Sequence, residues 1–142
     1  MVDGADLIVV EGPEAAPRVD MKATRTRVRR RLRIAASIAV VPGFVAARVG
    51  GDEALLGRGG SDLTAALLGA CLRARRVEIF TDVAGVMTAP PALVPGARLI
   101  ELMSPAEARE LAALGARVLY RRTLEPLVGS GIWTWNKYWH DH

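Results

Sequence analysis

Runs of apolar residues alternate with helical patterns along this chain, and this alternation constrains its fold more than any other feature. Three runs predict strands, at 5–10, 37–44 and 77–83. Helical spacing predicts helices between and after them, at 23–36, from Ser61 onward and at 104–115. Such alternation is typical of a mostly parallel sheet covered by helices on both faces. The sequence therefore predicts an α/β fold, and we expect one domain.

Local signals refine these elements. Ser104 is suited to cap the third helix, Glu107 to close a capping box with it, and Gly115 to end the helix. Residues 46–57 read as a loop or short hairpin, residues 84–97 as a loop, and residues 123–128 as a short helix before a last strand from Ile132. The helix after Ser61 is expected to bury one face, formed by Leu63, Ala66, Leu67, Ala70 and Cys71.

The charge of the chain is concentrated in one segment. The net charge is +4, but residues 18–33 hold eight basic side chains and one acid, so they carry +7 and the remainder carries about −3 (4 − 7). Such a run on a helix is usually a solvated face, and no aromatic side chains interleave with it as they often do in nucleic-acid binding proteins. We therefore expect no nucleic-acid partner.

Membrane insertion and secretion find no support in the sequence. The longest apolar stretch, 34–47, is too short to span a bilayer and contains Pro42 and Gly43. The single cysteine, Cys71, allows no internal disulfide and lies on the predicted core face, where an inert buried thiol is expected. These features predict a soluble cytoplasmic protein. His140 and His142 flank Asp141 but lack further ligands, so no metal site is predicted.

A glycine-rich loop precedes the second helix. Gly57, Gly59 and Gly60 allow close approach of the backbone to a ligand, and the following helix adds the positive end of its dipole. Arg58 adds a guanidinium that matches a carboxylate or phosphate. The spacing fits neither a P-loop nor a dinucleotide fingerprint. The loop is suited to an anion, and the alternative is a tight turn with Ser61 as an ordinary N-cap.

Four ordered blocks resemble the aspartate kinases, within the amino acid kinase family. "LGRGGSDLTAALLGA" is similar to their substrate signature, and "VPGF" precedes it at the expected distance. "TDVAGVMTAPPALVPGARLI" is similar to their nucleotide-binding segment, and "SPAEARELAALGARVLYRRTLEPL" to the next block. "MKATRTRVRRRL" resembles the helix before the strand into "VPGF". The resemblance predicts a partial amino acid kinase domain at 1–132 and a divergent aromatic tail at 133–142.

This resemblance implies a three-layer αβα sandwich and a phosphoryl transfer from ATP, with Mg²⁺, to the β-carboxylate of L-aspartate. The product, β-aspartyl phosphate, leads to lysine, threonine and methionine. Arg58 would hold the substrate α-carboxylate beside Gly59, Gly60 and Ser61, and Asp62 would face the amino group or organise a catalytic lysine. The implied nucleotide-binding residues are Thr81, Asp82, Gly85, Met87, Arg117 and Val118. For Asp62, Thr81–Asp82 and Arg117, the alternatives are a helix-dipole partner, a strand-end turn and a solvated charge.

Several positions depart from the family pattern. The family's Lys-Phe-Gly-Gly-Thr-Ser loop has no counterpart, and the two lysines, Lys22 and Lys137, stand in other contexts. Residues 89–92 read Ala-Pro-Pro-Ala instead of Ala-Asp-Pro-Arg, and Arg117 replaces a lysine. We therefore interpret the chain as a C-terminal portion of the kinase domain. Two hypotheses stay open: an aspartate kinase, and a non-catalytic partner that binds nucleotide, aspartate or a full kinase subunit. A homo-oligomer or pairing with another kinase chain is expected.

Overall fold

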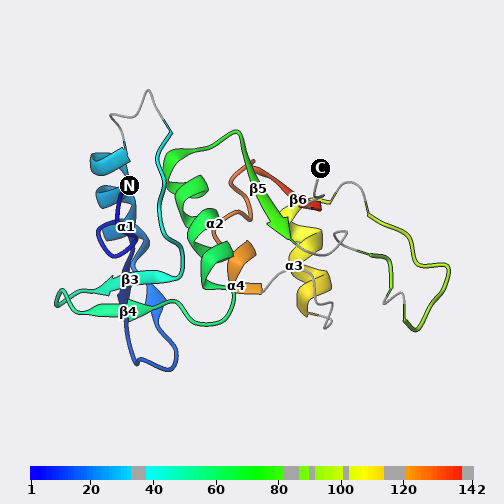
Figure 1. Cartoon of the computed structure of the whole chain (residues 1–142), viewed down its shortest axis with the longest axis horizontal. Helices are drawn as coiled ribbons and strands as arrows, with labels where there is room; N and C mark the ends of the chain where they lie inside the picture. Colours follow the sequence, from blue (N-terminus) through cyan, green and yellow to red (C-terminus); the bar gives the residue numbers. More distant parts are fainter. Residues whose placement is uncertain (33–37, 82–86, 90–91, 101–102, 114–120, 139–142) are drawn as a thin grey trace.

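A computed structural model describes residues 1–32, 38–81, 87–89, 92–100, 103–113 and 121–138. The elements form two separate sheets with helices between and beside them (Figure 1). The strands are β1 (Val9–Glu11), β2 (Arg18–Val19), β3 (Val45–Arg48), β4 (Glu53–Leu55), β5 (Arg76–Thr81) and β6 (Trp133–Tyr138). The helices are α1 (Met21–Leu32), α2 (Gly60–Leu72), α3 (Pro105–Ala113) and α4 (Arg121–Leu124).

The first sheet has the order β2-β1-β3-β4. Strands β1 and β3 are parallel, with Val9 opposite Ala47, whereas β1–β2 and β3–β4 are antiparallel. The buried hydroxyl of Thr24 on α1 accepts a hydrogen bond of 3.0 Å from the Val9 amide, so α1 is tied to the central strand. The sequence predicts a loop or a short hairpin at 46–57, and the antiparallel β3–β4 pair shows that these residues form the hairpin.

The second sheet pairs β5 with β6 in parallel, from Arg76 opposite Trp133 to Thr81 opposite Tyr138. Helix α2 lies between the two sheets in Figure 1. Its residues Leu63, Leu67 and Cys71 join the core of the first sheet, while Ala66 joins the core of the second. Burial is confirmed for four of the five predicted residues, Leu63, Ala66, Leu67 and Cys71, but they pack into two cores rather than one, because a sheet lies on each side of α2.

The α/β fold is confirmed, with mixed pairing among the described strands rather than a mostly parallel sheet. The strand predicted at 5–10 begins only at Val9, because residues 4–7 form a turn in which Leu7 and Ile8 both donate to the carbonyl of Gly4. The strand predicted at 37–44 is wrong for its described residues: 38–42 lie outside both sheets, and Ile38 is 94% exposed.

The displaced strand has a backbone cause. Phe44 adopts a φ of 75°, which interrupts an extended path, and Pro42 has no amide to donate to a ladder. Regular pairing therefore starts only at Val45. The helix predicted at 23–36 is described only to Leu32, and its predicted last residues, 33–36, lie outside the described residues.

The capping box of α3 is confirmed. The Ser104 amide donates to the Glu107 carboxylate at 2.8 Å, and the Glu107 amide donates to the Ser104 hydroxyl at 3.2 Å. The helix predicted at 123–128 is shorter and starts earlier, because turns replace it from residue 125. No helix among the described residues is long and apolar enough to cross a membrane.

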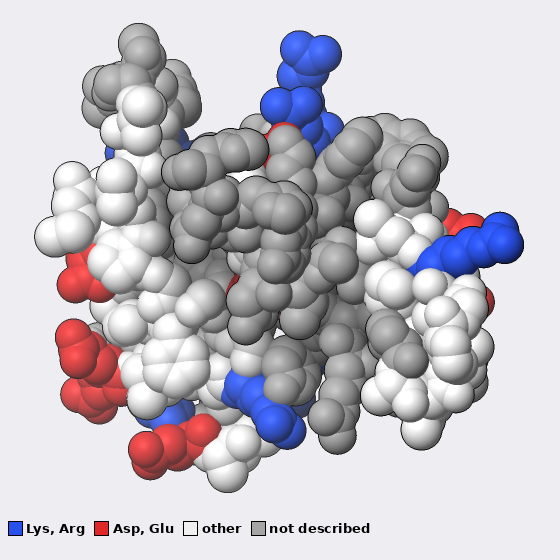
Figure 2. Space-filling model, turned by 45° about the vertical axis from the view of Figure 1, so that its right-hand side comes forward, with Lys and Arg blue, Asp and Glu red and all other residues white. Residues whose placement is uncertain are grey.

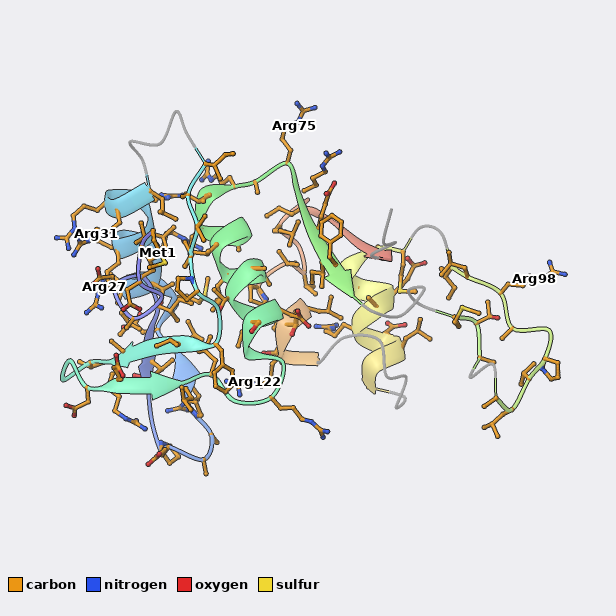
Figure 3. The ribbon with its side chains drawn as sticks, in the orientation of Figure 1. Met1, Arg27, Arg31, Arg75, Arg98 and Arg122 are labelled. Atoms are coloured by element: carbon orange, nitrogen blue, oxygen red, sulfur yellow. The ribbon has the colours of Figure 1, made fainter. Side chains whose placement is uncertain are left out.

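The basic side chains of α1 hold the helix on its neighbours. Arg27 donates to the carbonyl of Ala5 at 3.3 Å, and Arg29 to the carbonyl of Cys71 at 3.1 Å. Arg31 lies 3.5 Å from the carboxylate of Asp6. Figure 3 shows Arg27 and Arg31 on the side of the molecule that carries α1. Several arginines of the basic segment therefore stabilise the packing of α1 instead of only facing solvent.

Candidate functional site

The glycine-rich loop joins β4 to the first turn of α2. Gly57 and Gly59 have φ values of 76° and 70°, so both need the left-handed conformation that glycine adopts without strain. Gly59 is the N-cap and offers no side-chain hydrogen bond to the helix. The alternative interpretation of Ser61 as an ordinary N-cap is therefore wrong, because the helix already begins at Gly60.

Two backbone donors in the first turn of α2 have no partner among the described residues. The Gly60 amide donates to the Gly57 carbonyl and the Leu63 amide to the Gly59 carbonyl, both at 2.9 Å. The amides of Ser61 and Asp62 have no acceptor in the part of the chain that the structure describes. They lie at the positive end of the helix dipole, where a carboxylate or phosphate is stabilised.

The turn at Pro42–Phe44 packs directly on this helix terminus. A Cβ atom added to Gly43 would lie 3.0 to 3.2 Å from Ser61 atoms, which is closer than ordinary contact. A Cβ atom added to Gly60 would lie 2.7 Å from the Phe44 ring. Gly43 and Gly60 are therefore required because neighbouring atoms leave no room for a side chain. Gly57 and Gly59 are required because their backbone has a positive φ.

A buried threonine connects the turn to the helix. The Thr64 hydroxyl accepts a hydrogen bond of 3.1 Å from the Phe44 amide and donates one of 2.9 Å to the Gly60 carbonyl. Thr64 is only 3% exposed. Sequence reasoning missed Thr64, since a threonine inside an apolar helix gives no local sign of a partner twenty residues earlier.

Arg122 braces the same loop from α4. Its guanidinium donates to the carbonyl of Leu56 at 3.5 Å and to the carbonyl of Pro17. Leu56 immediately precedes Gly57, so this contact supports the base of the loop (Figure 3). Arg122 was also missed, because its two partners lie 66 and 105 residues away in the sequence.

The side chains of the predicted substrate site differ in exposure. Arg58 and Ser61 are exposed, whereas Asp62 is half-buried. Burial raises the pKa of the Asp62 carboxyl above its usual value, because desolvation penalises the charged form. A cation placed beside Asp62, such as an ammonium group, would favour its ionised form.

The predicted nucleotide-binding residues are only partly described. Thr81 is the last residue of β5, and Met87 pairs with Leu99 in an isolated antiparallel bridge. Asp82, Gly85, Arg117 and Val118 lie outside the described residues. The same holds for His140 and His142. No group of three His, Cys, Asp or Glu side chains suited to a metal ion occurs in the described ranges.

Charge is unevenly distributed on the surface. On the face seen in Figure 2, acidic side chains gather mainly along one margin, and basic side chains stand in separate places. Figure 3 places Arg98 on the loop that extends farthest from the body and Arg75 at another end of the molecule. The described basic residues on the visible face therefore do not form one continuous patch.

A profile described as the amino acid kinase family matches residues 2–134. The chain belongs to this family. Among its relatives, the bifunctional aspartokinase/homoserine dehydrogenase of Haemophilus influenzae is 39% identical over 93% of the chain, and the lysine-sensitive aspartokinase 3 of Escherichia coli is 45% identical over 70% of it. These matches cover 16% and 22% of the respective relatives.

A solved structure of an amino acid kinase family member has the same fold. The crystal structure of E. coli aspartokinase III in complex with aspartate and ADP, in the R-state, superimposes with a TM-score of 0.88 at 35% identity. The alignment covers 96% of this chain and 31% of that one. The chain therefore corresponds to a part of the kinase domain and spans less than a third of the relatives described above.

Proposed function

We propose that this chain forms the aspartate-binding part of an aspartate kinase, which phosphorylates the β-carboxylate of L-aspartate with ATP. The observation that carries the proposal is the first turn of α2, where two open amides, a glycine turn and the exposed Arg58 meet. The 0.88 TM-score to an aspartokinase holding aspartate and ADP supports the same assignment.

In this proposal the chain binds both charged groups on the α-carbon of the substrate, the carboxylate and the ammonium. Its α-carboxylate lies on the guanidinium of Arg58 and on the amides of Ser61 and Asp62, because these donors suit an anion. The half-buried Asp62 carboxylate takes the substrate ammonium group or orients a lysine. The β-carboxylate then points away from the anion site and is free to react.

The reaction joins one β-carboxylate oxygen to the γ-phosphorus of ATP while the bond from that phosphorus to ADP breaks. Such a transfer depends on positioning and on neutralising phosphoryl charge. The nucleotide would lie beyond the end of β5, at Thr81, Asp82, Gly85, Met87, Arg117 and Val118. Magnesium bound to the phosphates of ATP would supply part of that neutralisation.

A second function is favoured by one feature of the sequence. Residues 89–92 read Ala-Pro-Pro-Ala where the family pattern is Ala-Asp-Pro-Arg, so an acidic side chain and an arginine of the nucleotide-binding segment are replaced. A chain that binds aspartate or nucleotide without catalysis would then act as the partner of another kinase chain, in the cytoplasm.

Calorimetric titration with L-aspartate tests the binding site. Arg58→Ala is expected to weaken aspartate affinity by at least about tenfold, because a charge-assisted hydrogen bond to the carboxylate is lost. The matched control is Arg98→Ala, another exposed arginine, which Figure 3 places on the far loop, and it should bind as the unmodified chain does. An equal loss of aspartate affinity in both variants would reject the assignment of Arg58 to the substrate site.

A hydroxylamine trap separates the two functions. The folded chain is incubated with ATP, Mg²⁺, L-aspartate and hydroxylamine, and aspartyl hydroxamate is measured. Hydroxamate that depends on Arg58 would identify a kinase. Aspartate binding without hydroxamate would identify the non-catalytic partner.

A further inference from the structure

A cavity lies at the end of α2 opposite to the Gly57–Asp62 loop. Its volume is about 430 Å³, within the range of small-molecule sites. Three segments form its walls: the first half of α1, the end of α2 with the residues after it, and the turn at 126–132. Ala70 and Ala74 leave room between these walls because their side chains are small.

The cavity is lined by cations and no acids. Arg25, Arg73 and Arg75 contribute to its surface, and no Asp or Glu among the described residues does. None of the three forms an ion pair with a described carboxylate, in contrast to Arg31 on the same basic helix. Asp20 precedes α1, but its carboxylate accepts the Ala23 amide. The charge of the cavity is therefore not balanced from within the described part of the chain.

The arginines are not required to cap α2. Arg73 has a φ of 54° and its amide donates to the carbonyl of Ala70, while the amide of Ala74 donates to the carbonyl of Gly69. These backbone bonds satisfy carbonyls at the helix end. Arg25 lies beside the buried Cys71 thiol, and its charge counteracts the increase in the thiol pKa caused by burial. The guanidinium of Arg25 therefore stands at the wall formed by the end of α2.

The third wall offers an open backbone. Gly129 and Gly131 have φ values of 73° and 71°, and a Cβ atom added to either would meet nothing within 4 Å. Between them, the Ser130 hydroxyl donates to the Leu127 carbonyl and accepts from the Ile132 amide, which fixes the turn. The amides of Gly129 and Gly131 have no acceptor among the described residues. These two backbone donors add to the positive potential of the cavity that the arginines provide.

We propose that this cavity binds a small organic anion that carries a phosphate group. Arg25 and Arg73 contact the phosphate, and Arg75 adds charge at the rim, since Figure 3 shows it extending away from the body. The apolar walls at Met21 and Ile132 receive the organic part of the ligand. This site is independent of the aspartate site proposed above, because the two lie at opposite ends of α2.

Calorimetric titration of the whole chain with pyrophosphate tests the proposal. The double variant Arg25→Gln with Arg73→Gln is expected to weaken binding by at least about tenfold, because two charged donors are lost. Ala74→Glu should abolish binding while both arginines remain, since it adds a carboxylate to the wall. Arg30→Gln is the matched control: Arg30 is an exposed arginine of the same helix that does not line the cavity, and its variant should bind like the unmodified chain. Circular dichroism and the melting temperature establish that each variant is folded.

Two results would overturn the inference. Absence of pyrophosphate binding to the folded chain at low salt would reject the site. Binding that survives both cavity variants but disappears in Arg58→Ala would assign the anion to the glycine loop at the other end of α2. A further titration with inorganic phosphate should give weaker binding than pyrophosphate, since it carries less charge. Equal affinities for phosphate and pyrophosphate would contradict a site of this volume and charge.

Discussion

Replacement of Thr64 by valine should weaken the link between the Pro42–Phe44 turn and α2. Valine keeps the branched shape but lacks the hydroxyl that accepts from Phe44 and donates to the Gly60 carbonyl. The position is 3% exposed, so water cannot replace the lost partners without a rearrangement. The Phe44 amide then loses its acceptor at a residue whose φ of 75° already costs conformational energy.

The size of the effect follows from these contacts. Loss of the acceptor for the partly buried Phe44 amide, together with loss of the buried hydroxyl bond to Gly60, costs about 1–3 kcal/mol, so we expect the free energy of unfolding to fall by about 2 kcal/mol. For a chain of this length, about 2–4 °C per kcal/mol corresponds to a decrease in the melting temperature of roughly 4–8 °C. Thr64→Ser is the matched control. It keeps the hydroxyl and loses one methyl group, for about 1 kcal/mol.

Urea unfolding followed by circular dichroism measures both variants. The reasoning predicts that valine is more destabilising than serine, although valine retains more of the apolar volume. A valine variant as stable as the original chain, or a serine variant that is equally damaged, would refute the hydrogen-bonded link. If the turn also positions the substrate, the valine variant should bind L-aspartate more weakly at a temperature where it is fully folded.

Three other predictions concern single side chains. Ser104→Ala should destabilise the chain by about 1 kcal/mol in urea unfolding, because the hydroxyl that accepts from the Glu107 amide is lost. The pKa of Glu107 should stay below its usual value in an NMR titration, because the amide at position 104, the main cause of the lowered pKa, still donates to the carboxylate. The buried Cys71, whose pKa burial raises, should react with a thiol reagent more slowly than an unfolded control, and equal rates would contradict its burial. Burial also raises the pKa of Asp62 in the folded chain, so ionisation of this carboxyl opposes folding, and the chain loses stability as the pH rises from 3.8 through the raised pKa. Asp62→Asn should therefore increase the free energy of unfolding at neutral pH but not below pH 3.8. An identical gain at both pH values would show that charge is not the cause.

Signals between close neighbours in the sequence predicted several elements well. The capping box joins Ser104 to Glu107, three residues apart, and both of its hydrogen bonds form. The hairpin within 46–57 and the glycine turn before α2 depend on backbone preferences of single residues. The family blocks added the residues of the substrate loop, and four of the predicted nucleotide-binding positions lie outside the described structure.

Tertiary structure decided which apolar segment became a strand and which face of α2 is buried. The segment 38–42 is as apolar as a strand, but the conformation of Phe44 and the position of the hairpin start the pairing at Val45. Helix α2 is apolar on two sides because two sheets pack against it, and periodicity within one helix cannot reveal two partners.

The same division applies to the candidate site. The sequence by itself determined that a glycine turn with Arg58 precedes a helix, because adjacent residues encode both the turn and the start of the helix. Only the folded chain brings Thr64 to Phe44 and Arg122 to Leu56 and Pro17, across separations of up to 105 residues. These contacts depend on how the sheets and helices pack, and packing is a property of the whole chain that spacing along the sequence does not contain.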